Sequence, residues 1–251
     1  MDRRVSVALA GSAAASAAVA EPAADLITPS GLAWRWVVRP DALELYAAGN
    51  PGDADRRLTL ISGGGALHRA RIALEAEGLA PRVTLLPDAD PDHLATVVAE
   101  GPIAITADAR ARFDATEGPQ PPDMPPGVAG GRLASSPDVA GLARDLVAAA
   151  TAEGVRVSVR QEADELIAVL YGEDTPDAWL RAGEAMSAIR VEAARHGLTA
   201  VPTVAGRERP DPAPAPGASP APGASPSPGA PPAGDRRRDL RSVPYVHLRI
   251  A

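Results

Sequence analysis

The stretch LTLISGGGALHRARIALEAEGL, residues 58–79, decides the fold of this chain. Apolar residues recur at helical spacing, at positions 60, 61, 67, 72 and 74, and Gly78 is the residue type that ends helices. We therefore predict a long helix over 58–77. The glycines at 63–65 lack the spacing of a dinucleotide-binding loop. They favour close packing of this helix against a neighbour, with anion binding at their backbone N–H groups as the alternative.

A second long helix is predicted from Trp179 to His196, with Gly197 at its end. When Gly78 is aligned with Gly197, several positions match: Ala66 with Ala185, Leu67 with Met186, Arg71 with Arg190 and Leu79 with Leu198. The match indicates an internal duplication, although two alanine-rich helices also align by chance. If the duplication is real, the two helices pack against each other near the centre, as in a symmetric dimer.

Short apolar runs around these helices predict strands. Alternation over 33–46 is typical of a β-hairpin, and the continuous apolar run at 165–171 is typical of a central strand. Further strands are expected at 82–86, 155–159, 198–204 and 246–250, a helix at 137–152, and a short helix or strand at 91–99. The elements together predict an α+β protein.

Two regions have the composition of loops. Residues 101–134 are expected to form a loop or lid, because prolines and glycines cluster between 118 and 131. Residues 210–234 repeat the hexamer APGASP and predict a polyproline-like linker. We divide the chain into an alanine-rich segment (1–24), a main domain (25–206), a flexible insertion (207–240) and a final strand that returns to the domain (241–251).

Composition excludes several classes of site. The 251 residues contain no cysteine, and all 25 basic residues are arginine, so thiol and lysine chemistry are excluded. The four histidines show no metal-ligand spacing, so no metal site is expected. The net charge of −7 argues against a nucleic-acid partner, and no apolar run is long enough to span a membrane. We expect a cytoplasmic protein, with residues 1–20 as an export signal in the alternative.

Five segments resemble a known family. They are PSGLAWRW (29–36), LELYA (43–47), the helix at 58–79, RVTLLPDADPDHLA (82–95) and DTPDAWLRAGEAM (174–186). Together they resemble the flavin-binding nitroreductase-like superfamily, and within it an actinobacterial branch, linked to stress responses, whose single chain holds two fused halves. The resemblance implies a three-layer sandwich, with a central mixed sheet, helices on both faces and pseudo-two-fold halves.

The resemblance also implies FMN as cofactor. Ser30 and Thr203 would lie near the flavin ring, while Arg110, Arg112 and Arg249 would bind its phosphate. The implied function is an FMN-dependent oxidoreductase that passes hydride from NAD(P)H to a small-molecule substrate, as a monomer or homodimer and with no catalytic side chain of its own. The chain departs from the family at 31–33, where Gly-Leu-Ala replaces polar flavin ligands. The alternative is a degenerate, non-catalytic relative that sequesters FMN or no longer binds it.

Four other side chains are of types that occur in functional sites. Trp34 and Trp36 are expected in the core or an interface, with a stacking platform as the alternative. His68 is expected to be a half-exposed helix residue, and His93 a capping or surface residue. No Ser-His-Asp arrangement can be assigned from the sequence.

Overall fold

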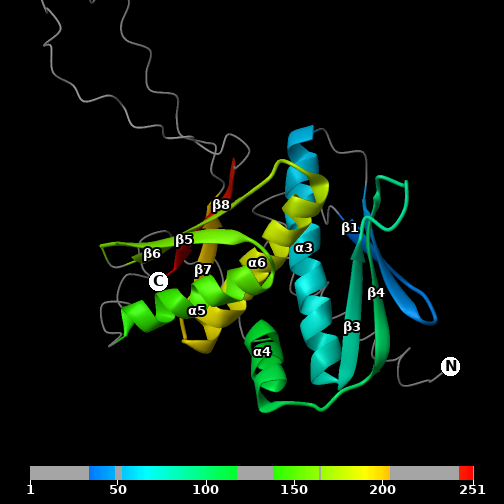
Figure 1. The fold of residues 1–251 in the computed structure, drawn as a ribbon, viewed down its shortest axis with the longest axis horizontal. Helices are drawn as coiled ribbons and strands as arrows, with labels where there is room; N and C mark the ends of the chain where they lie inside the picture. Colours follow the sequence, from blue (N-terminus) through cyan, green and yellow to red (C-terminus); the bar gives the residue numbers. More distant parts are fainter. Residues whose placement is uncertain (1–33, 49–52, 118–137, 164, 204–242, 251) are drawn as a thin grey trace, which may run out of the picture.

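The computed structural model describes residues 34–48, 53–117, 138–163, 165–203 and 243–250. Within these ranges it contains four helices and two four-stranded antiparallel sheets, so the protein has an α+β architecture (Figure 1). The predicted segments 1–24 and 207–240 lie outside the described residues. No helix in the described part of the chain is both long enough and apolar enough to cross a membrane.

The first half is built around the helix predicted at 58–77. Its elements are β1 (Trp34–Val38), β2 (Ala42–Ala47), α3 (Asp53–Ala76), β3 (Leu79–Leu85) and β4 (His93–Pro102), with the sheet order β1-β2-β4-β3. The helix ends at Gly78, whose φ of +77° suits glycine, and β3 begins at the next residue. The segment 91–99, left open between helix and strand, forms the start of β4.

The second half repeats this path. After α5 (Val139–Ala152) come β5 (Arg156–Glu162), β6 (Glu165–Gly172), α6 (Pro176–Arg195), β7 (Ala200–Thr203) and β8 (Val243–Ile250). The sheet order is β5-β6-β8-β7, the same as in the first half. β8 pairs with both β6 and β7, and the buried run Leu166–Leu170 lies in the inner strand β6. The repeated topology is what an internal duplication predicts.

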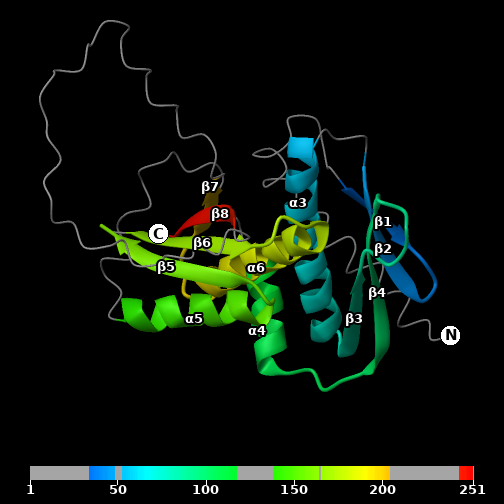
Figure 2. The same cartoon turned by 45° about the horizontal axis from the view of Figure 1, so that its top comes forward.

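The layers differ from the expected sandwich. We expected one central mixed sheet with helices on both faces, but all described strand pairs are antiparallel and form two sheets. α3 packs on the first sheet, α6 packs on the second, and the two helices pack on each other between them (Figures 1 and 2). The mixed-sheet expectation was wrong because β1 and β2, β3 and β4, and β5 and β6 follow each other along the chain without an intervening helix, and such hairpins pair antiparallel.

The packing of α3 on α6 confirms the prediction that these helices meet at the centre. A Cβ on Gly64 would overlap the carbonyl oxygen of Leu180, and a Cβ on Gly183 would overlap that of Ile61. Gly64 and Gly183 occupy matching positions in the alignment of the two halves, so the close approach is reciprocal. The glycines therefore serve close helix packing, as favoured from the sequence.

The expected loop at 101–134 is wrong in its first part. Residues Ala107–Glu117 form α4, which packs against both α3 and α6. The side chain of Thr106 accepts a hydrogen bond from the backbone N–H of Ala109 at 3.0 Å, which stabilises the start of the helix. The Pro- and Gly-rich cluster begins only after this helix, at residue 118, and lies outside the described residues.

Candidate functional site

The predicted phosphate-binding arginines of the first half lie on α4. Arg112 donates to Glu75 of α3 at 2.8 Å and lies 3.1 Å from Asp108 one turn earlier. Its guanidinium is therefore balanced by two carboxylates of the chain itself. Arg110 is exposed on the same helix. Of the two, only Arg110 presents its charge to solvent without an ion pair to another described residue.

The remaining predicted flavin contacts lie elsewhere. Arg249 on β8 forms a two-pronged ion pair with Glu165 on β6, with both N–O distances at 2.8 Å. Figures 1 and 2 show α4 and β8 well apart. Thr203 is the last residue of β7, where its backbone is in register with His247, and Ser30 lies outside the described residues. The structure therefore does not bring Arg110 and Arg112 together with Arg249.

A buried polar cluster occupies the interface of the central helices. His68 of α3 is only 5% exposed, and its Nδ1 lies 3.1 Å from the hydroxyl oxygen of Ser187 on α6. The half-exposed position expected for His68 was wrong, because α6 covers this face of α3. Burial, and then the positive charges of Arg71, Arg112 and Arg69, lower the pKa of His68 to about 3. The ring is therefore neutral at pH 7, and its 3.7 Å approach to Glu153 is not an ion pair.

An ion-pair network continues this cluster. Arg71 donates to Glu153 at 2.6 Å and to Glu184 of α6 at 3.0 Å. Burial alone would lower the pKa of Arg71, but the two carboxylates outweigh it and raise the pKa. The Glu184 carboxyl is 4% exposed, and burial raises its pKa despite the opposing charge of Arg71. The network joins both helices to Glu153, the residue that caps the C-terminus of α5.

Two further arginines add positive charge near the same interface. Burial, followed by the charge of Arg190 on α6, lowers the pKa of Arg69 on α3 to about 10. Burial also lowers the pKa of Arg190. The guanidinium groups of Arg69, Arg71 and Arg190 thus lie near this interface, and that of Arg71 forms ion pairs with Glu153 and Glu184.

The two tryptophans of β1 belong to the packed interior. Trp34 is 2% exposed and donates its indole N–H to the hydroxyl of Ser62 at 2.9 Å. Trp36 meets Trp34 edge to face, with ring centroids 6.4 Å apart. The expectation that they belong to the core is confirmed for Trp34, and Trp36 packs against that core.

Asp88, His93 and Thr96 form a hydrogen-bonded relay at the start of β4. His93 Nδ1 lies 2.8 Å from Asp88, and its Nε2 lies 3.0 Å from the hydroxyl of Thr96. A register shift in β2 places Tyr46 opposite His93, and the two rings stack at 4.4 Å. His93 is 6% exposed, so the surface position expected for it was wrong.

In this relay Asp88 orients the imidazole of His93, and the imidazole in turn bonds to the hydroxyl of Thr96. An ionised Asp88 can only accept, so in the neutral ring Nδ1 carries the proton and Nε2 accepts from Thr96. The hydrogen bond from His93 and that from the backbone of Asp90 lower the pKa of Asp88. The sequence spacing Asp-x4-His-x2-Thr could have suggested the group, but only the strand register brings the side chains together. We assign it the role of fixing the 86–92 turn to the sheet.

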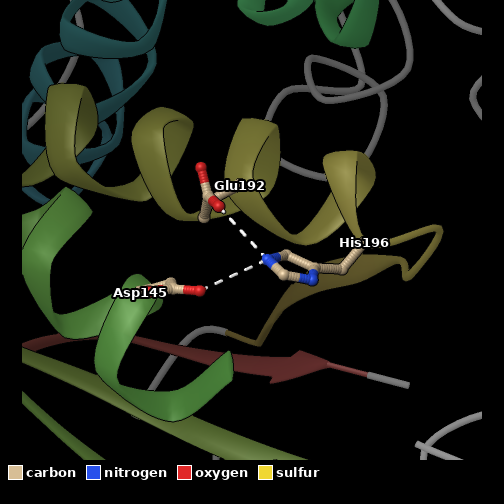
Figure 3. Close-up of side chains that lie close together, drawn as sticks. All are labelled: Asp145, Glu192 and His196. Atoms are coloured by element: carbon tan, nitrogen blue, oxygen red, sulfur yellow. Dashed lines mark ion pairs between the residues drawn. The ribbon is translucent and has the colours of Figure 1, made fainter. Parts of the chain in front are cut away.

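A second group that sequence reasoning missed lies between α5 and α6. His196 Nε2 is 3.2 Å from Glu192 and 3.5 Å from Asp145 (Figure 3). The donor atoms of the three side chains lie within 4.8 Å of one another. Glu192 and His196 are one turn apart on α6, whereas Asp145 comes from α5. A search of the sequence for paired histidines cannot find this group, because two of its three donors are carboxylates.

Comparison with known proteins leaves the family open. No known protein family matches this chain, and no curated protein matches it significantly.

Proposed function

We propose that this chain is a shortened, internally duplicated relative of the nitroreductase-like flavoproteins that has lost productive FMN binding and acts as a non-catalytic binding protein. The observation that carries the proposal is the pairing of Arg112 and Arg249 with carboxylates of the chain. Both arginines are predicted phosphate ligands, and both are already balanced.

The duplicated architecture supports the relationship. Two of the segments that carry the resemblance fall on corresponding parts of the two halves, because residues 58–79 cover most of α3 and the following turn, and residues 174–186 lead into α6. The two helices cross through reciprocal glycines, Gly64 and Gly183. One chain thereby provides the contact that two identical subunits would make in a symmetric dimer.

The predicted ligands do not fit the phosphate of FMN. A phosphate is bound strongly where an arginine can offer it two parallel N–H groups. Arg249 uses such a fork on Glu165, and Arg112 uses its guanidinium on Glu75 and Asp108. The exposed Arg110 is one charge on one helix. A phosphate would have to displace existing ion pairs, so this arrangement favours the non-catalytic reading.

The competing function is an FMN-dependent oxidoreductase that uses NAD(P)H. Arg110 is exposed two residues before Arg112 on α4, so its charge is available to a phosphate, which favours this function. It requires Arg112 to leave Glu75 and Asp108 when FMN binds. The two functions therefore differ in whether Arg112 stays paired with Glu75 and Asp108 when FMN is present.

Titration of the purified protein with FMN, followed by quenching of flavin fluorescence, tests the proposal. We expect no saturable quenching with wild type up to about 100 μM FMN, an affinity of about −5.5 kcal/mol or weaker. The double variant Glu75→Gln, Asp108→Asn releases Arg112 and is expected to gain measurable binding. Arg144→Ala, on the exposed face of α5, is the matched control and should change nothing.

The opposite result is equally specific. Saturable quenching of the wild type, weakened about tenfold to a hundredfold by Arg110→Ala or Arg112→Ala, would overturn the proposal and support the flavoenzyme. A test for NAD(P)H oxidation with the FMN-loaded protein would then follow.

A further inference from the structure

We propose that Asp145, Glu192 and His196 form a binding site for a divalent transition metal ion, and that Zn²⁺ is the ion this site prefers. The site combines one imidazole nitrogen with two carboxylate oxygens. Zn²⁺ binds these donor types, and three protein ligands leave a fourth position for water. Mg²⁺ and Ca²⁺ prefer oxygen ligands alone, so the imidazole selects against them.

The backbone places these donors independently of any ion. Glu192 and His196 share one face of the last turn of α6. At the end of that helix the backbone N–H of His196 bonds to the carbonyl oxygens of Glu192 and Ala193, and the N–H of Gly197 bonds to that of Ala194. Asp145 lies on α5, which packs against α6. Two packed helices therefore hold the three side chains in place, with His196 pointing between the carboxylates (Figure 3).

The distances suit a small ion. Zn²⁺ bonds its nitrogen and oxygen ligands at about 2.0–2.1 Å, so in a tetrahedral site two ligand atoms lie about 3.3–3.4 Å apart. His196 Nε2 lies 3.2 Å from Glu192 Oε1 and 3.5 Å from Asp145 Oδ2. The two carboxylates lie within 4.8 Å of each other, so binding of an ion between the three atoms draws them together.

Neighbouring charges orient the site and leave it acidic. Arg195 donates to the other oxygen of Glu192 at 3.0 Å and lies 3.0 Å from Asp108 of α4. Glu192 Oε1 thus stays directed at His196, as an outer partner orients a ligand in known metal sites. Arg195 is shared between Glu192 and Asp108, so it offsets only part of the negative charge of the two ligating carboxylates, which attract a divalent cation.

The site is open to solvent. The side chains of Asp145 and His196 are 53% and 41% exposed, whereas that of Glu192 is 17% exposed. An ion reaches the site directly, and once bound it links α5 to α6. The chain has no cysteine, so no thiolate competes for Zn²⁺.

Calorimetric titration of the tag-free, chelator-treated full chain with ZnCl₂ tests the proposal. We expect one equivalent bound with a micromolar dissociation constant, a higher melting temperature with Zn²⁺, and no response to MgCl₂. His196→Ala and Asp145→Asn should each weaken binding at least tenfold. Asp177→Asn, which removes an exposed acid in the first turn of α6, is the matched control and should bind as wild type does.

Two outcomes would overturn the proposal. One is the absence of binding heat and of any melting shift up to about 1 mM Zn²⁺, a concentration at which even a binding energy of about −4 kcal/mol is detectable. The other is binding that His196→Ala and Asp145→Asn leave unchanged, since the ion would then sit elsewhere. Circular dichroism of each variant separates a lost site from a lost fold.

Discussion

The first half of the chain, β1 to β4, and the second half, β5 to β8, follow the same path around their central helices but differ in the charges they bring to the helix interface. Arg71 of α3 and Arg190 of α6 occupy matching positions. Arg71 meets Glu184 of α6, whereas the position that matches Glu184 in α3 is Gly65. Accordingly the pKa of Arg71 is raised and that of Arg190 is lowered.

The difference shows what fusion of two halves permits. In a symmetric homodimer every substitution occurs twice, so a contact near the axis must suit both copies. Here His68 of one half contacts Ser187 of the other at matching positions, a pairing of unlike residues that two identical subunits could not make. The glycine crossing has stayed reciprocal while the polar residues around it have diverged.

The largest expected effect is on the ion-pair network in which Arg71 of the first half meets Glu153 and Glu184 of the second. Arg71→Met leaves Glu153 and Glu184 buried without their cation, so we expect a loss of about 3–5 kcal/mol in the free energy of unfolding. Arg190→Met removes a cation that burial already disfavours, and it should cost clearly less. Urea denaturation of both variants measures the difference, and equal losses would contradict the asymmetry between the halves.

The reciprocal crossing is expected to give the next largest effect. Gly64→Ala and Gly183→Ala each force a methyl group into a backbone carbonyl of the other helix, and we expect each to cost about 3 kcal/mol. Gly65→Ala is the control, because its Cβ would meet only the carbonyl oxygen of Gly183 at an ordinary 3.8 Å. Thermal melts should show two strongly destabilised variants and one near wild type. If only one of the two crossing variants is destabilised, the crossing is not reciprocal.

A pH dependence distinguishes His68 from its counterpart Ser187. The pKa of His68 is about 3 in the folded protein and about 6.5 when unfolded, so only the unfolded state gains a proton as the pH falls below 6.5. Stability contributed by the neutral ring is complete above pH 6.5 and is lost between pH 6.5 and 3, at about 1.4 kcal/mol per pH unit.

Urea midpoints at pH 7 and pH 5 measure this slope. His68→Gln should be less stable than wild type at pH 7 but should lose less stability on acidification. Thr84→Val, at an exposed side chain that carries no charge, is the control and should keep the wild-type slope. An unchanged slope in His68→Gln would show that other groups dominate the acid response.

The smallest effect is expected on the outer face of the first sheet. Thr96→Val removes one hydrogen bond to His93, which we expect to cost about 1 kcal/mol. Thr84→Val, at the exposed position paired with Thr96 on β3, is the control and should stay within about 0.5 kcal/mol of wild type. Chemical denaturation of the pair measures this, and equal effects would show that the relay adds nothing beyond strand propensity.

The sequence by itself determined the local elements. Apolar periodicity and terminal glycines fixed the helices later seen as α3 and α6, because both signals depend on residues within a few turns of one another. Alternation placed the β1–β2 hairpin, and the continuous apolar run placed β6. The alignment around Gly78 and Gly197 also indicated that the halves repeat. The whole of α4 was missed, since the prolines and glycines from residue 118 onward dominated the prediction for 101–134.

Tertiary structure alone decided the layers and the sites. No local signal tells whether two hairpins join one sheet or two, because the answer depends on where each central helix returns the chain. Sequence likewise could not pair Arg112 with Glu75, His93 with Thr96 or Asp145 with His196, or show that α6 buries His68. Each of these contacts depends on the packing of helices or on strand register, which set distances between residues that spacing along the chain leaves undetermined.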